Sequence, residues 1–238
     1  MHRIHSPADM STDSLLESWQ ATLKRIENAA LRSGRSPNDI RLLAISKGQS
    51  VEKIRRIALA GQQEFGENYL QEALEKVHNL ADLQLTWHFV GQIQGNKTRA
   101  IAENFAWAHT VDRERIAIRL NDQRPPETPA LNICIQVMLE AEQGKAGVAP
   151  ADVLPLARRI SELPRLRLRG LMCIPPHKET FDEQLALFTR LADLARELTS
   201  EGMTIDTLSM GMSDDLEAAI AAGSTCVRIG TAVFGPRL

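Results

Sequence analysis

The sequence predicts one α/β domain folded as a (β/α)8 barrel, and three observations favour this class. Eight short apolar segments alternate with amphipathic segments, which is typical of βαβ units around a parallel sheet. The length of 238 residues suits a single core of this size. Two stretches, 209–215 and 225–232, each run from a short apolar strand into a Gly/Ser/Thr turn. In such barrels the loops after strands seven and eight often bind phosphate.

The first long amphipathic segment precedes this alternation. Leu15, Trp19, Leu23 and Ile26 recur at three- and four-residue steps, which predicts a helix over 11–33 that packs outside the barrel or against its lower end. Residues 1–10 lack an apolar core, so they indicate a disordered N-terminus rather than a signal peptide. We therefore expect a single barrel domain over 11–238.

The remaining elements follow in strict order. Strands are expected at 40–46, 63–65, 86–90, 107–110, 131–139, 166–173, 207–210 and 225–229, with 131–139 the longest. Helices are expected at 51–60, 67–80, 95–104, 112–120, 151–163, 179–200 and 214–222, before a short last turn. Asp112 is the expected N-cap of its helix.

Composition excludes several classes of protein. The net charge of -2 shows no basic excess for nucleic acid, and no apolar run reaches the roughly 18 residues of a membrane span. These features are typical of a cytoplasmic protein. Cys134, Cys173 and Cys226 lie inside apolar runs, so we expect buried, reduced thiols.

Lys47 is the sharpest candidate at a strand end. Alternation along the strand places Leu43, Ile45 and Lys47 on one face, at the mouth of an apolar barrel. Partial desolvation there would lower the pKa of the amine, and the neutral amine attacks aldehydes. The alternative is a lysine whose ammonium reaches solvent from the strand end.

Arg228 is the second candidate, because it lies inside the otherwise uncharged strand 225–229. A buried guanidinium needs a partner, which would be an acid such as Glu64 or Glu67, or else a ligand. An aldehyde-reactive lysine, a phosphate site and a buried arginine together fit pyridoxal 5′-phosphate (PLP). An arginine at the pyridine nitrogen would disfavour its protonation and weaken the ring as an electron sink.

His88 and His109 are the only histidines that lie within predicted strands. No further His, Cys or carboxylate stands at metal-ligand spacing from either of them. We therefore expect hydrogen-bonded core or rim histidines rather than metal ligands.

Several motifs resemble the pyridoxal phosphate homeostasis protein family, from about residue 14 to the end of the chain. They are AISK (44–47), FGEN (65–68), WHFVGQIQGNK (87–97), HTVD (109–112), KAG (145–147), LM with IPP (171–172, 174–176), SMGMSD (209–214) and RIGTA (228–232). The resemblance implies the barrel of the alanine racemase N-terminal domain standing alone. It also implies a cytoplasmic PLP-binding protein of vitamin B6 homeostasis, without established catalytic activity, that buffers or delivers PLP.

The resemblance also implies roles for individual residues. Lys47 would be the Schiff-base lysine, Arg228 would face the pyridine nitrogen and Asn68 would lie near the ring. Ser213, Gly230 and Thr231 would bind phosphate, with Ser209 as a further candidate. Lys145 matches a lysine that is a candidate transit site for PLP. A monomer is expected, with PLP-dependent apoenzymes as candidate partners.

One segment departs from the family pattern. After the lysine the family usually has Thr, a variable residue and Pro, whereas this chain has Gly48, Gln49 and Ser50. This segment loses the fixed proline and gains a flexible glycine, so we expect a less rigid loop after Lys47.

Two enzyme classes are the alternatives. An amino-acid racemase needs a second base, which relatives with this barrel take from a tyrosine of a further β domain. The one tyrosine here is Tyr69, and the sequence stops at Leu238, soon after the last predicted strand. A sugar-phosphate enzyme with Lys47 as its Schiff-base residue would use the phosphate site but would leave Arg228 without a role.

Overall fold

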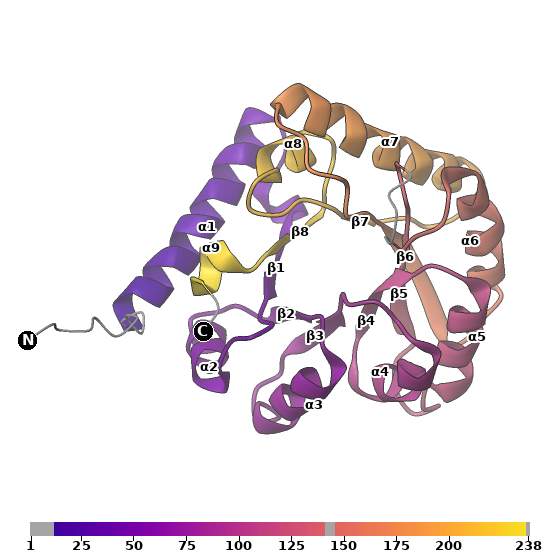
Figure 1. Ribbon diagram of the computed structural model, residues 1–238, viewed down its shortest axis with the longest axis horizontal. Helices are drawn as coiled ribbons and strands as arrows, with labels where there is room; N and C mark the ends of the chain where they lie inside the picture. The colour runs from indigo at the N-terminus through magenta and orange to yellow at the C-terminus, as the bar shows by residue number, and fades with distance from the viewer. Residues whose placement is uncertain (1–11, 141–145, 237–238) are drawn as a thin grey trace, which may run out of the picture.

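A closed barrel of eight parallel strands lies at the centre of the computed structural model, which describes residues 12–140 and 146–236. Each strand pairs with the next one along the chain, and β8 closes on β1. Figure 1 shows the ring of strands with the helices around its outside. The predicted fold class is confirmed.

The strands are β1 Arg41–Ile45, β2 Glu64–Glu67, β3 Thr86–Phe89, β4 Trp107–Val111, β5 Leu131–Gln136, β6 Leu166–Met172, β7 Thr207–Ser209 and β8 Cys226–Ile229. The α-helices are α1 Thr12–Arg32, α2 Val51–Leu59, α3 Leu70–Asn79, α4 Thr98–Asn104, α5 Glu114–Gln123, α6 Val153–Ser161, α7 Phe181–Ser200, α8 Leu216–Ala221 and α9 Thr231–Phe234. Short 3₁₀ helices are η1 Pro37–Asp39, η2 Gly95–Lys97 and η3 Pro150–Asp152.

Most of the predicted helix starts lie two or three residues before the observed ones, and two of these differences have a clear structural reason. The helix expected from residue 67 begins at Leu70, because Glu67 stays in β2, where it pairs with Phe89 of β3. Asp112 does not cap α5. Its carboxylate accepts a hydrogen bond from the Arg113 side chain at 2.7 Å, and Arg113 is the residue that precedes the helix.

The prediction that 131–139 is the longest strand was also wrong. β5 ends at Gln136, whereas β6 is seven residues long. Val137 still donates its N–H to the Met172 carbonyl at 2.8 Å, but it also forms an isolated bridge with Val148. The Gln136 side chain donates to the Ala146 carbonyl at 2.9 Å. The segment after Gln136 therefore pairs with the segment around Val148 instead of extending β5.

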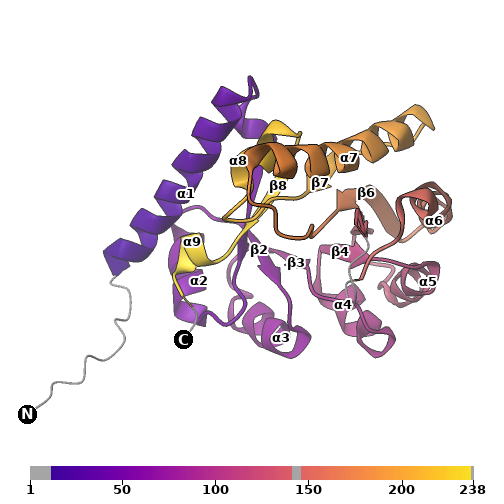
Figure 2. The same ribbon diagram turned by 45° about the horizontal axis from the view of Figure 1, so that its top comes forward.

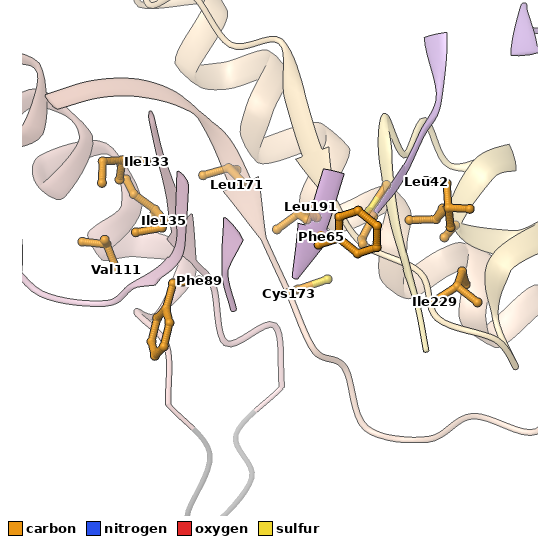
Figure 3. Close-up of a cluster of buried hydrophobic side chains, with 14 of the residues drawn as sticks. Leu42, Phe65, Phe89, Val111, Ile133, Ile135, Leu171, Cys173, Leu191 and Ile229 are labelled. Atoms are coloured by element: carbon orange, nitrogen blue, oxygen red, sulfur yellow. The ribbon is translucent and has the colours of Figure 1, made fainter. Parts of the chain in front are cut away.

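The main core lies between the barrel and its helices. In β1, Leu42 and Ala44 belong to this outer layer, while Leu43 and Ile45 face a separate interior cluster. This alternation follows from the period of two along a strand. Figure 3 shows outer-layer side chains, including Phe65, from most of the eight strands.

The helix α1 packs on the outside of the barrel, against α2, α8 and α9 (Figures 1 and 2). The Trp19 indole donates to Gln62 at 3.1 Å, and Arg25 makes a bidentate pair with Glu217 at 2.6 and 2.7 Å. The Thr22 hydroxyl contacts the Ala232 carbonyl at 3.4 Å. The helix thus supports the segment that follows β8.

Two further expectations concern the described residues. The three cysteines are buried and free, as predicted. No helix within 12–140 and 146–236 is long and apolar enough to cross a membrane. The predicted N-terminus, 1–10, and Lys145 lie outside the described residues.

Candidate functional site

An open pocket of about 640 Å³ lies at the carboxyl ends of the strands. Its lining includes the six residues that the sequence singled out for binding: Lys47, Asn68, Ser213, Arg228, Gly230 and Thr231. Ile45 and Val90 come from inside the barrel, and Ile174 and Met212 from the loops after β6 and β7. The pocket therefore combines apolar walls with two cationic side chains.

Lys47 follows β1 on the face that points into the barrel mouth, and its side chain is half-buried. Both peptide groups beside it are held. Lys76 Nζ donates to the Ser46 carbonyl at 2.6 Å, and the Gly48 N–H donates to Glu72 Oε1, also at 2.6 Å. The backbone that carries Lys47 is thus fixed by two side chains of α3.

These two side chains belong to a buried charge cluster. Lys76 Nζ lies 2.7 Å from Glu67 Oε1 and 2.5 Å from Glu72 Oε1, and the Ser46 hydroxyl donates to Glu67 Oε1 at 2.6 Å. Burial raises the pKa of Glu67, and Lys76 opposes this shift. Sequence reasoning missed Lys76. The i,i+4 spacing of Glu72 and Lys76 was a usable signal, but Glu67 had been assigned to the helix.

The loop after Lys47 is an ordered turn despite its departure from the family pattern. Gly48 has a φ of +69°, in the left-handed region that favours glycine. The Gln49 N–H donates to the Ser46 carbonyl at 3.0 Å. Ser50 is the N-cap of α2 and accepts from the Lys53 N–H at 3.4 Å. These hydrogen bonds define the turn, and the lower rigidity expected from the absence of the proline stays a prediction.

Arg228 is buried, and its guanidinium is bound by uncharged acceptors. Nη1 donates to the Ser209 carbonyl at 2.5 Å and to Ser209 Oγ at 2.8 Å, and Nη2 donates to the Cys173 carbonyl at 2.8 Å. The alternative of a salt bridge with Glu64 or Glu67 was wrong, because these acids pair with Arg41 and with the Lys76 cluster.

Ser213, Gly230 and Thr231, which were predicted to bind phosphate and which we call the anion cup, line the side of the pocket next to β7 and β8. Ser213 lies in the turn before α8, and Gly230 is the residue before α9. The first N–H groups of a helix have no acceptor within it, so Thr231 and Ala232 present backbone donors. A Cβ on Gly230 would lie 3.2 Å from the Ile45 carbonyl, which is a tight contact.

The side-chain oxygen of Asn68 indicates whether a bound molecule would suit this pocket. Its Oδ1 is buried and has no hydrogen-bond partner among the described residues, although the residue lines the pocket. A buried acceptor without a donor is costly, so this atom fits a donor from a bound molecule. Gly91 fixes the Asn68 backbone, since a Cβ there would lie 2.0 Å from the Asn68 carbonyl.

Ser209, His88 and His109 are fully buried beneath the pocket and do not line it. Ser209 Oγ contacts His109 Nδ1 at 2.8 Å, so this candidate for the anion cup faces the barrel interior. Within the described ranges, no group of three His, Cys, Asp or Glu side chains could hold a metal ion.

The comparisons with known proteins confirm that this fold is the barrel of the alanine racemase N-terminal domain. The family model of the alanine racemase N-terminal domain matches residues 20–237. Pyridoxal phosphate homeostasis proteins from Pseudomonas aeruginosa and Vibrio cholerae are 52% and 49% identical to this chain. The alignments cover 96% and 94% of this chain and 97% of each relative. The chain belongs to the pyridoxal phosphate homeostasis protein family.

A solved structure agrees with this assignment. PipY of Synechococcus elongatus, determined with PLP bound, is 38% identical and superposes with a TM-score of 0.81. The match covers 93% of this chain and 100% of PipY.

Replacing Lys76 by Met tests the charge cluster. Removing one partner of a buried ion pair leaves Glu67 and Glu72 uncompensated, so we expect the free energy of unfolding to fall by about 3–5 kcal/mol. Urea denaturation measures this change. Lys24→Met is the matched control, because the Lys24–Glu27 pair is exposed and such pairs contribute about 0–1 kcal/mol. Equal losses in the two variants would contradict the role of the cluster.

Proposed function

We propose that this chain binds PLP in the pocket through Lys47 and holds it for buffering or delivery, without catalysing a reaction. The observation that carries the proposal is the convergence of three features on one pocket. They are a lysine facing the barrel mouth, a buried guanidinium without a carboxylate partner among the described residues, and the anion cup. The PLP-bound structure of the relative PipY supports it.

The pocket residues fit the parts of the molecule. When bound, PLP supplies an aldehyde that reacts with amines and a ring that withdraws electrons. Lys47 provides the amine, and Ser213, Gly230 and Thr231 provide donors for the phosphate. Ile45 and Val90 flank the ring from inside the barrel.

Arg228 completes the fit on the side toward the barrel interior. A guanidinium has five N–H donors, and the three hydrogen bonds of Arg228 to Ser209 and Cys173 leave two, one of which can donate to the ring nitrogen. Its positive charge disfavours a proton on that nitrogen.

The same residues support a carrier rather than a racemase. Of the described residues that line the pocket, Lys47, Asp214 and Arg228 have titratable side chains. Tyr69 is 59% exposed and does not line the pocket. Tyr69 therefore does not provide the second base that racemisation needs on the opposite face of the ring. Arg228 also weakens the ring as an electron sink.

The wider role is part of the proposal. PLP-dependent apoenzymes are the recipients, the cytoplasm is the location, and the carrier is a monomer. The open mouth of the pocket supports exchange with a recipient. Lys145, which lies outside the described residues, is the candidate transit site for PLP on its way to or from Lys47.

Borohydride trapping tests the role of Lys47. Reduction of the PLP-loaded protein, followed by peptide mass mapping, should find PLP attached to Lys47, because its amine is the one held in the pocket. Lys47→Ala should abolish the visible absorbance of the bound molecule. Lys24→Ala, on exposed α1, should leave it unchanged. Attachment only at another lysine would refute the assignment.

A comparison of PLP with pyridoxal tests the anion cup. Charge-assisted hydrogen bonds contribute about 1.5–3 kcal/mol each, so PLP should bind at least 10- to 150-fold more tightly. Thr231→Val should weaken PLP binding while leaving pyridoxal binding nearly unchanged. Thr189→Val, whose hydroxyl bonds within α7, is the matched control. Fluorescence titration measures the two affinities. Equal affinities of the native protein for PLP and pyridoxal would contradict phosphate binding by the anion cup.

A further inference from the structure

A chain of polar side chains runs through the barrel interior beneath Arg228. Arg228 Nη1 lies 2.8 Å from Ser209 Oγ, which lies 2.8 Å from His109 Nδ1. His109 Nε2 lies 2.9 Å from His88 Nδ1, and His88 Nε2 faces Glu64 Oε2 at 3.6 Å. We call Ser209, His109 and His88 the buried polar chain. It links strands β7, β4 and β3 across the barrel.

Both histidines of this chain are neutral. Burial lowers the pKa of His109 to about 3, with further contributions from Arg228 and Arg41. Burial also lowers the pKa of His88 well below its ordinary value, with smaller contributions from His109 and Arg41. Each ring therefore carries one N–H and offers one acceptor nitrogen.

Arg228 sets one consistent direction for these hydrogen bonds. A guanidinium only donates, so the Ser209 hydroxyl accepts from Arg228 and donates to His109 Nδ1. His109 Nε2 then donates to His88 Nδ1. The proton of the neutral His88 is left on Nε2, which has no hydrogen-bond partner among the described residues and lies 3.6 Å from Glu64 Oε2. Every polar atom between Arg228 and His88 Nδ1 thus has a partner in one consistent arrangement.

The hydrogen-bond acceptors of Arg228 differ from those of most buried arginines, which pair with a carboxylate. A carboxylate partner would pair with the guanidinium and compensate its charge. Here the head group is bound by two backbone carbonyls and by the Ser209 hydroxyl, whose hydrogen points away toward His109. The nearest acid along the chain, Glu64, is three side chains away and pairs with Arg41.

We propose that Ser209, His109 and His88 are positioning residues that hold the Arg228 guanidinium at the pocket without neutralising its charge. This inference rests on the proposed function, since the group that Arg228 faces is the ring nitrogen of PLP. The chain holds the guanidinium so that one of its remaining N–H groups can donate to that nitrogen. Sequence reasoning placed the two histidines in the core but assigned no role to them.

The test compares PLP with its analogue in which a C–H replaces the ring nitrogen. The ratio of their dissociation constants isolates the contact with Arg228, because both compounds carry the same aldehyde and phosphate. In the native protein PLP should bind about 10- to 150-fold more tightly than the analogue, the value of one charge-assisted hydrogen bond.

Three variants then probe the chain. His109→Leu removes both links, and Ser209→Ala removes the hydroxyl alone, so in each the ratio should fall toward one. His109→Asn is the conservative control, because its amide oxygen can replace Nδ1 as the acceptor for Ser209, and it should keep most of the native ratio. Ser209→Ala decides the outcome if His109→Leu does not fold.

The outcomes separate the two proposals. If the native protein binds PLP and His109→Leu and Ser209→Ala keep the native ratio, the positioning role is wrong and the proposed function stands. A native ratio of one would also overturn the positioning role. If the native protein binds neither compound, the proposed function fails and the inference fails with it.

Discussion

The parallel pairing of β1 with β8 is the constraint on which the site depends. Leu43 lies opposite Arg228 and Ala44 opposite Ile229, in strands that begin and end the barrel. This register places the residues after the two strands side by side. Lys47 on one side and Gly230 with Thr231 on the other therefore line the same pocket. Closure of the barrel brings together the Lys47 amine and the proposed anion cup, which are about 180 residues apart in the sequence.

Charge is distributed differently on the two sides of this junction. Next to β1, Lys76 and two glutamates form a compact ion cluster that holds the peptide groups around Lys47. Next to β8, the Arg228 guanidinium has neutral acceptors. A buried ion pair needs good geometry and further hydrogen bonds to offset the desolvation of its charges. The cluster around Lys76 has such geometry and such hydrogen bonds, and it positions the backbone beside Lys47. Arg228 has no carboxylate partner among the described residues, so its charge is not compensated at the pocket.

Sequence periodicity was sufficient for the barrel and for the position of Lys47. Strand alternation depends only on local residues, and it predicted that Lys47 faces the barrel mouth. Arg228 was found because it is a charged residue inside an otherwise uncharged strand. The Ser/Gly/Thr turns were recognisable because their residue types suit anion binding at a helix start.

What the sequence could not supply were contacts between distant strands. The partners of Arg228 come from β7 and from the segment after β6, and the two histidines meet across β3 and β4. Neither pairing leaves a local pattern. The role of Lys76 was missed because Glu67 reads equally well as a strand end or a helix start. The length of β5 was overestimated because its apolar run continues past Gln136 into the segment that bridges to Val148.

The central claim is that this pocket retains PLP without directing its chemistry onto amino acids. The most direct measurement is α-hydrogen exchange of L-alanine in deuterium oxide, followed by NMR with the PLP-loaded protein. We expect the PLP-loaded native protein to show no more α-hydrogen exchange than the Lys47→Ala variant. Exchange or racemisation at ordinary enzyme rates, about 1 s⁻¹ or more, that disappears in Lys47→Ala would contradict it.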